Sequence, residues 1–350
     1  MNRLFLLIPF LNFPLMLIAQ VSTNNKSSMI ISTTGYMTRD FADSNRTNWL
    51  ATGPRPLRTA IWYPSDTGGV KESINDPLQF SLPVSAYHDA KLLPGKKYPL
   101  ILISHGAQGN ARQMRWLAYY FASRGYIAAV VNHNGTKYEE RSTGLLTLTD
   151  FCMWERPQDL SVVLDKLLKD PVFAKSIDTT KIVAAGFSLG GATVIWLSGA
   201  ILNLHGLETR SPQPPAQFLT EINAHKSMAE TDSTVKLSFR HAQDSYQDKR
   251  VKAVFALSPA IGQGFDKQGL MGIHVPVQIV VGDQDIVNPM AENAKYYTDN
   301  IPSAKKLIVL PGERGHYTKP PLGNERPVEL EEVSRIAFDF FYAILYPSDN

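Results

Sequence analysis

The sequence predicts an α/β protein with a mostly parallel central sheet and helices on both faces of that sheet. Apolar runs of strand length, such as residues 99–104 and 126–131, are typical of strands that are covered on both faces. Segments with helical periodicity alternate with these runs along the chain. A glycine-rich turn also joins one apolar run to a helix-length apolar segment within residues 181–202.

The composition fits a folded protein of this class. The chain has 350 residues, of which 44% are hydrophobic and 19% are charged, so it can bury a sizeable core in one large domain. Its formal net charge is +3, and the charges are mixed along the chain, so we expect no nucleic-acid partner. Cys152 is the sole cysteine, which excludes an internal disulfide.

Residues 1–20 differ from the rest of the chain. Arg3 precedes a stretch, Leu4–Ala19, that is almost wholly apolar and ends in small residues. This pattern predicts a secretory signal peptide. A transmembrane anchor is the alternative, but it needs about 20 apolar residues, and this stretch is shorter and contains Pro9 and Pro14. We therefore expect a secreted or periplasmic protein, with no cysteine for a lipid anchor and no stable membrane insertion after signal removal.

The first half of the mature chain predicts an antiparallel edge followed by parallel strands. Residues 29–34 and 57–63 are interpreted as two edge strands joined by a polar loop. Residues 66–97 are rich in Pro, Gly, Asp and Ser and indicate a long excursion with little regular structure. Buried strands are then expected over 99–104 and 126–131, with a helix over 112–124 between them.

The second half predicts further strand and helix pairs. The clearest helix spans residues 154–169, because its leucines and valine recur at helical spacing from Leu160 onward. Strands are expected over 182–185, 251–257, 277–281 and 307–310, and helices over 192–202, 289–300 and 328–345. Residues 203–250 carry several prolines and no strand pattern. We expect residues 21–350 to form a single domain in which 203–250 is a cap over the preceding turn.

The turn itself, Gly186-Phe187-Ser188-Leu189-Gly190, is a G-x-S-x-G sequence between a predicted strand and a predicted helix. This context is that of a nucleophile elbow. A serine on such a sharp turn has strained backbone, and a Cβ two residues before or after it would clash. The glycines at these two positions therefore indicate that Ser188 is a catalytic nucleophile.

A nucleophilic serine needs a histidine base that is oriented by a carboxylate, and on this kind of turn the acid and then the histidine follow the serine along the chain. The loop after residues 277–281 carries Asp283 and Asp285, and the loop after the last strand carries His316. Either aspartate could orient the histidine. We favour Asp285 because it lies further into the loop, towards the rim of the sheet.

The negative charge that develops on a reacting carbonyl oxygen needs two backbone donors. One is expected from the N–H of Leu189, directly after the serine, and the other from the N–H of Ala107 in the loop after residues 99–104. His105 in the same loop precedes the serine and is expected to be structural. Pocket candidates are His133, Trp154 and Phe187, although packing or loop stabilisation would also explain them.

Five segments together resemble a known group of proteins. They are Arg58–Pro64, Ser104–Gly106, Asn132–Thr136, Glu155–Leu160 and Gly186–Gly191. The chain, from about Met29 to its end, is similar to the α/β-hydrolase branch that contains plasma-type platelet-activating factor acetylhydrolases and predicted dienelactone hydrolases. The resemblance implies an α/β-hydrolase fold and hydrolysis of short-acyl esters by a triad that by position would be Ser188, Asp285 and His316.

The leading hypothesis is therefore a serine esterase acting on a small-molecule ester, with no metal and no cofactor, because no metal-binding sequence motif is present. A binding protein on a catalytically silent scaffold is an alternative of another class. A peptidase or amidase on the same scaffold is a third reading. The oligomeric state is left open by the sequence.

Overall fold

The structure is a computed structural model that describes residues 32–74, 84–135, 151–209, 226–316 and 326–347. The strands are β1 (Thr34–Thr47), β2 (Pro54–Pro64), β3 (Val70–Ile74), β4 (Val84–His88), β5 (Tyr98–Ser104), β6 (Ile127–Val131), β7 (Ile177–Phe187), β8 (Val251–Leu257), β9 (Val277–Gly282) and β10 (Ile308–Leu310). Within the described residues they form one ten-stranded sheet in the order β10-β9-β8-β7-β5-β6-β2-β1-β4-β3. The strands from β10 to β6 are mutually parallel, whereas β2 is antiparallel to both of its neighbours.

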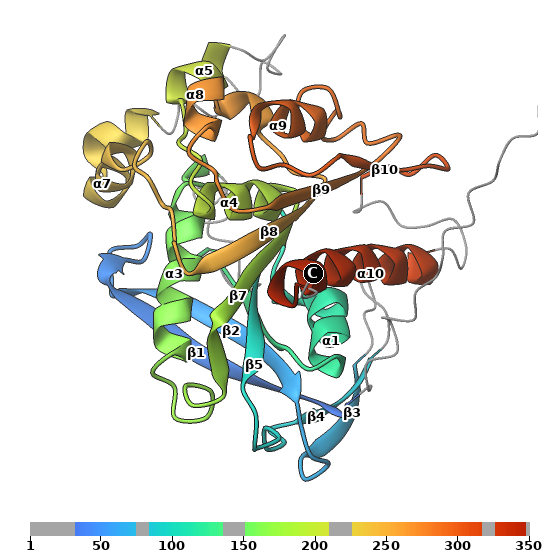
Figure 1. Ribbon diagram of the computed structural model, residues 1–350. Helices are drawn as coiled ribbons and strands as arrows, with labels where there is room; N and C mark the ends of the chain where they lie inside the picture. The colour runs from blue at the N-terminus through green and yellow to red at the C-terminus, as the bar shows by residue number, and fades with distance from the viewer. Residues whose placement is uncertain (1–31, 75–83, 136–150, 210–225, 317–325, 348–350) are drawn as a thin grey trace, which may run out of the picture.

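Helices cover both faces of this sheet (Figure 1). Those described are α1 (Arg115–Ser123), α3 (Glu155–Leu167), α4 (Leu189–Leu197), α5 (Leu204–Thr209), α7 (Ser233–Arg240), α8 (Lys267–Leu270), α9 (Ala294–Asn300) and α10 (Arg326–Leu345), with 3-10 turns η1 (Ala111–Met114) and η3 (Gly262–Gly264). Every residue of β5 is buried. Its alternate side chains belong to different cores, Leu100 and Leu102 to one, and Ile101 and Ile103 to the other.

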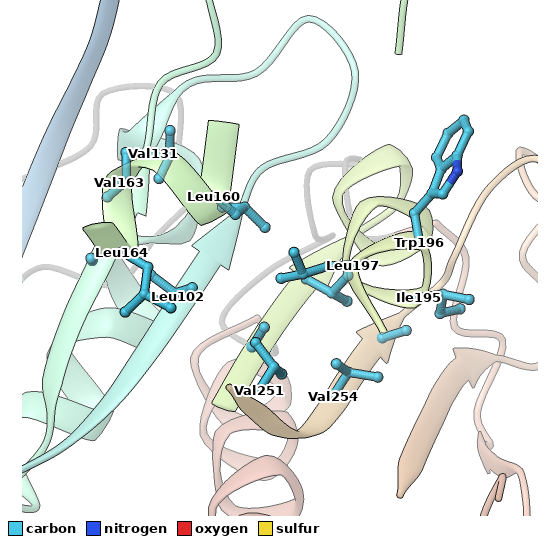
Figure 2. Packing of buried hydrophobic residues seen from close by; sticks show 14 of the residues in the cluster. Leu102, Val131, Leu160, Val163, Leu164, Ile195, Trp196, Leu197, Val251 and Val254 are labelled. Carbon is cyan, nitrogen blue, oxygen red and sulfur yellow. The ribbon is translucent and has the colours of Figure 1, made fainter. Parts of the chain in front are cut away.

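The first core lies between the sheet and helices α3 and α4. Figure 2 shows Leu160 and Leu164 of α3 beside Leu102, and Leu197 of α4 beside Val251. The second core is formed with α1 and α10 and contains a group of aromatic side chains around Phe121 and Phe338. A sheet covered on both faces in this way confirms the predicted fold class, a mostly parallel α/β sheet of the α/β-hydrolase type.

Three local predictions were wrong. The predicted polar loop before residue 57 is mostly strand, because β1 begins at Thr34 and pairs with β2 over almost its whole length. The excursion over 66–97 contains β3 and β4, which pair with each other and place β1 inside the sheet. The helix predicted over 192–202 instead spans Leu189–Leu197. It ends there because Gly199 adopts a positive φ of 125° soon after Leu197.

The insertion predicted at 203–250 contains helices in its described part. The short helix α5 lies near η3, and α7 packs beside the N-terminal end of α3 (Figure 1). Asp232 caps α7, since its carboxylate accepts the N–H groups of Thr234 and Val235 at 2.8 and 3.0 Å. Residues 210–225 of the insertion, and the signal peptide predicted over 1–20, lie outside the described residues.

Candidate active site

Ser188 occupies a strained turn between β7 and α4. Its backbone has φ 54° and ψ −118°, which lies outside the regions that side-chain-bearing residues normally adopt. The Ser188 N–H donates to the Leu257 carbonyl at 2.9 Å, and the Ser188 carbonyl accepts from Ala260 N–H at 3.1 Å. The end of β8 thus holds the serine at the carboxyl edge of the parallel strands, where functional groups of such sheets gather.

The glycines around Ser188 are required by close backbone contacts. A Cβ on Gly186 would lie 2.0 Å from the carbonyl oxygen of Gly190, and a Cβ on Gly190 would lie 2.1 Å from that of Ser104. Real Cβ atoms do not approach backbone oxygens so closely. The predicted steric reason for glycine at both positions is confirmed.

His316 and Asp285 form a buried pair next to this turn. The Nδ1 atom of His316 lies 2.9 Å from Oδ2 and 3.1 Å from Oδ1 of Asp285. Oδ1 also accepts the backbone N–H groups of Val287 and Asn288 at 3.1 and 2.9 Å. Burial alone would raise the pKa of Asp285. The hydrogen bonds that it accepts from His316, from the Asn288 backbone and from the Ser258 hydroxyl outweigh burial, and the net effect is a lowered pKa.

The other aspartate of the loop has different partners. Asp283 accepts the backbone N–H groups of Gly312 and Glu313 at 3.1 and 3.3 Å, and that of Arg314 at 2.7 Å. These three bonds shape the loop that leads to His316. The structure therefore places Asp285 on the histidine and Asp283 on the backbone of the histidine loop.

The hydroxyl of Ser188 lies beside this pair. Its Oγ is 3.4 Å from the side-chain nitrogen of Asn288, which also donates to the carbonyl of Ser258 at 2.8 Å. The ring of Phe187 packs against the ring of His316, with centroids 4.9 Å apart. Among the described residues, no hydrogen bond joins the Ser188 hydroxyl to His316. The arrangement can deliver a serine nucleophile, a base and an orienting acid once the hydroxyl turns towards Nε2.

The two predicted oxyanion donors lie in segments that meet at the nucleophile turn. Leu189 is the first residue of α4, where backbone N–H groups lack partners within the helix. Ala107 is exposed in the turn after β5. That turn approaches the elbow closely, because a Cβ on Gly190 would lie 2.6 Å from the His105 carbonyl. The same carbonyl accepts a hydrogen bond from the buried guanidinium of Arg156, which fixes the position of the turn.

A buried ionic network lies behind this turn. Asp159 accepts two hydrogen bonds from Arg55, at 2.7 and 3.0 Å, and one from Arg46 at 2.7 Å. Arg46 also binds Glu155 at 2.6 Å. Burial alone would raise the pKa of Asp159, but the two guanidinium groups hold it well below its usual range. The network joins the β1–β2 hairpin to the first turns of α3.

The structure places His133, a predicted pocket residue, inside this network. Its Nδ1 lies 2.9 Å from Asp159 and its Nε2 lies 2.9 Å from the Ser104 hydroxyl. Burial, followed by the positive charge of Arg156, lowers the pKa of His133 to about 3. The ring is therefore neutral at pH 7, with Nδ1–H donating to Asp159 and Nε2 accepting from Ser104. Both ring nitrogens are committed to protein groups.

Trp154 and Phe187, the other two pocket candidates, are also interior. The indole N–H of Trp154 donates to the carbonyl and hydroxyl of Ser238 at 2.9 Å each, and its ring packs on Phe239 at 5.1 Å. Phe187 is fully buried beneath His316. Trp154 thus holds α7 to α3, and Phe187 supports the histidine. Their contact with substrate stays a prediction.

Sequence reasoning missed Asp159, Ser258 and Asn288. A signal existed for Asp159, since it lies four residues before Val163 on the apolar face of α3, where a carboxylate needs a buried partner. Ser258 and Asn288 lie in irregular segments whose contacts no local pattern indicates. The two residues after Asp285, Ile286 and Val287, were also missed, and they are 69% and 55% exposed beside the site.

Within the residues that the structure describes, no group of three or more His, Cys, Asp or Glu side chains could hold a metal ion. In the same part of the chain, no helix has both the length and the apolar character needed to cross a bilayer.

The chain is similar to three kinds of hydrolase. Residues 70–143 match the family described as platelet-activating factor acetylhydrolase, isoform II. Dipeptidyl-peptidase 5 of Porphyromonas gingivalis is 31% identical over 113 residues, which are 30% of this chain, and the match spans 15% of that protein's length. A solved ferulic acid esterase from Streptomyces cinnamoneus has a TM-score of 0.59 at 19% identity, with 89% of each chain covered. The sheet order and the similarity to the esterase structure show the α/β-hydrolase fold, and the other two similarities fit a hydrolase with that fold.

Proposed function

We propose that the protein is a serine hydrolase that cleaves small or short-acyl carboxylic esters through an acyl-enzyme intermediate. One observation carries this proposal. Ser188, in a strained turn with φ 54°, lies beside a His316–Asp285 pair whose Nδ1–Oδ2 distance is 2.9 Å. Such a pair can hold the imidazole in the tautomer that leaves Nε2 as a base.

In the first half of the reaction, Ser188 Oγ attacks the ester carbonyl carbon while Nε2 of His316 takes the hydroxyl proton. The charge on the carbonyl oxygen is stabilised by the N–H groups of Leu189 and Ala107. His316 then returns the proton to the departing alcohol as the carbon–oxygen bond breaks. Asp285 stays ionised throughout and stabilises the imidazolium, in keeping with its lowered pKa.

In the second half, His316 takes a proton from water, and the resulting hydroxide attacks the acyl carbon. The bond to Ser188 Oγ breaks, and Oγ regains its proton from His316. The exposed apolar side chains of Ile286 and Val287 beside the acid suit the uncharged part of an ester. Similarity to an acetylhydrolase family over residues 70–143 supports a short acyl group.

Covalent labelling with a fluorophosphonate tests this proposal. The purified protein should become labelled on Ser188 and on no other serine. It should also hydrolyse nitrophenyl acetate or butyrate faster than long-chain esters. Ser188→Ala should remain folded and lose both the label and the esterase activity. Labelling at another residue, or undiminished hydrolysis by Ser188→Ala, would refute the proposal.

Peptide hydrolysis is a second candidate, because the 113-residue match is to a dipeptidyl-peptidase. The same nucleophile and base can cleave amides, so the chemistry does not separate the two. Parallel kcat/KM measurements on nitrophenyl esters and on dipeptidyl nitroanilides separate them. We expect the esters to be favoured, and higher kcat/KM on the nitroanilides would make the peptidase the better assignment.

We also propose that the protein acts outside the cytoplasm. The support is the charge and apolar pattern of residues 1–20. The native protein should begin at Gln20 or Val21 and be recovered from the periplasm or the medium. N-terminal sequencing that finds Met1 in a soluble cytoplasmic fraction would contradict this.

A further inference from the structure

We propose that Asn288 is a positioning residue that directs the hydroxyl proton of Ser188 towards His316. This inference rests on the proposed serine-hydrolase function. Asn288 contacts both the nucleophile and the acid. Its side-chain nitrogen lies 3.4 Å from Ser188 Oγ, and its backbone N–H donates to Asp285 at 2.9 Å.

The orientation of the Asn288 amide follows from its other contact. The side-chain nitrogen lies 2.8 Å from the carbonyl oxygen of Ser258. A carbonyl can only accept, so the NH2 end of the amide must face Ser258, and a flipped amide would place two oxygens together. The atom that faces Ser188 Oγ is therefore a donor. Ser258 is itself held with a positive φ of 45° and is buried, which fixes the direction of its carbonyl.

A donor at this position constrains the serine hydroxyl. A hydroxyl group has one proton and two lone pairs. When Asn288 donates to Oγ, the proton of Ser188 cannot point at the amide, and the direction towards His316 remains available to it. The 3.4 Å contact is long, and such hydrogen bonds tighten in the complex with substrate. The same donor would stabilise negative charge on Oγ when the acyl group leaves it.

The test compares two asparagines of the same region, Asn288→Ala and Asn293→Ala. Asn293 is the matched control, because its side chain contacts backbone groups alone, accepting from Gly262 N–H at 2.9 Å and donating to the Pro289 carbonyl at 3.1 Å. The readouts are the second-order rate of fluorophosphonate labelling, its dependence on pH, and the melting temperature.

Asn288→Ala should label about tenfold more slowly, the size expected for one lost hydrogen bond. The pH midpoint of labelling should not move, because the backbone N–H of residue 288 persists and still holds Asp285. Asn293→Ala should melt at a lower temperature and label at the wild-type rate per folded molecule.

Labelling of Asn288→Ala at the wild-type rate would overturn the inference. A moved pH midpoint would overturn it too, because it would show that the substitution acts by disturbing the loop of Asp285. Absence of labelling at Ser188 in the wild-type protein would refute the proposed function, and with it this inference. Normal labelling of the wild type together with an unaffected Asn288→Ala would refute the inference alone.

Discussion

Two buried histidine–aspartate pairs in this molecule share one geometry and differ in their surroundings. In each, Nδ1 of the ring lies 2.9 Å from a carboxylate oxygen, His133 on Asp159 and His316 on Asp285. Nε2 of His133 is hydrogen-bonded to Ser104, whereas His316 lies beside the strained turn of Ser188. The pair alone therefore does not make a base. What the second nitrogen faces decides whether a pair can move a proton.

The carboxylates also differ in what keeps them ionised. Asp159 is held by two arginines, which are permanent charges. Asp285 is held by backbone N–H groups and the Ser258 hydroxyl, which are dipoles. In the proposed mechanism a positive charge forms and disappears on His316 in every cycle. Fixed dipoles suit this better than arginines would, because they add no positive charge to oppose an imidazolium.

The largest expected effect distinguishes the two histidines by their contribution to kcat. His316→Ala should lower kcat by about 10⁴ to 10⁶-fold with little change in melting temperature, because it removes the base. His133→Gln should keep kcat within about tenfold and lower the melting temperature instead, since it removes buried hydrogen bonds. Steady-state kinetics and thermal unfolding of both variants test this. A folded His133→Gln that has lost catalysis would contradict the distinction.

A second test applies to the aspartates of the acid loop. Asp285→Asn should lower kcat by about 10⁴-fold, because asparagine permits the wrong tautomer of His316. Asp283→Asn should cost about 1 kcal/mol of stability through weaker backbone hydrogen bonds and change kcat modestly. The measurements are kcat and the thermal midpoint. If Asp283→Asn proves inactive and Asp285→Asn stays active, the acid lies two residues earlier.

A third test concerns the pair of His133 and Asp159, whose carboxylate binds two arginines. Asp159→Asn should destabilise the protein by about 3 to 5 kcal/mol, because it leaves Arg55 buried without the carboxylate that its guanidinium binds. Asp165→Asn on the exposed side of α3 is the matched control, and its ion pair with Arg250 should contribute about 0 to 1 kcal/mol. Urea unfolding gives both values. Equal losses for the two variants would show that burial does not strengthen the dependence on Asp159.

A fourth test uses the pH dependence of stability. His133 has a pKa of about 3 in the folded protein and about 6.5 when unfolded. Between these values the unfolded state binds the proton, so stability falls as the pH drops from about 6.5 towards 3, by at most about 1.4 kcal/mol per pH unit. His133→Gln should flatten this slope, which urea unfolding at several pH values between about 3 and 7 would measure. Parallel slopes for wild type and His133→Gln would contradict the assignment.

The parts of the fold that could be predicted are those with local patterns. The apolar runs of β5 and β7 to β9 are buried on both faces, so their composition reveals them. Strand β1 could not be predicted, because it is rich in polar residues that belong to an ionic network reaching α3. Asp43, for example, is buried against Arg46, which in turn binds α3. Such compensation depends on tertiary contacts.

The candidate site divides in the same way. Local sequence patterns, namely the glycine turn and the loops that follow apolar strands, allowed the prediction of Ser188, Asp285 and His316. The contact of Asn288 with Ser258 joins positions 30 residues apart in the chain, and its contact with Ser188 joins positions 100 residues apart. A single sequence shows no relation between such positions. The same reason explains why His133 was assigned to the pocket when its partner is Asp159.

The start of α3 has a consequence for the order in which the protein assembles. Three consecutive residues there hold three separate segments: Trp154 binds Ser238 on α7, Glu155 binds Arg46 on β1, and Arg156 binds the carbonyl of His105. These contacts join positions 84, 109 and 51 residues apart. During synthesis, therefore, the first turn of α3 has all its partners only after residue 238 has left the ribosome. A nascent chain can collapse around β5 and β6 earlier. The start of α3, which carries Arg156 against the Ala107 turn, is anchored to α7 only later, so activity should be among the last properties that the folding chain acquires.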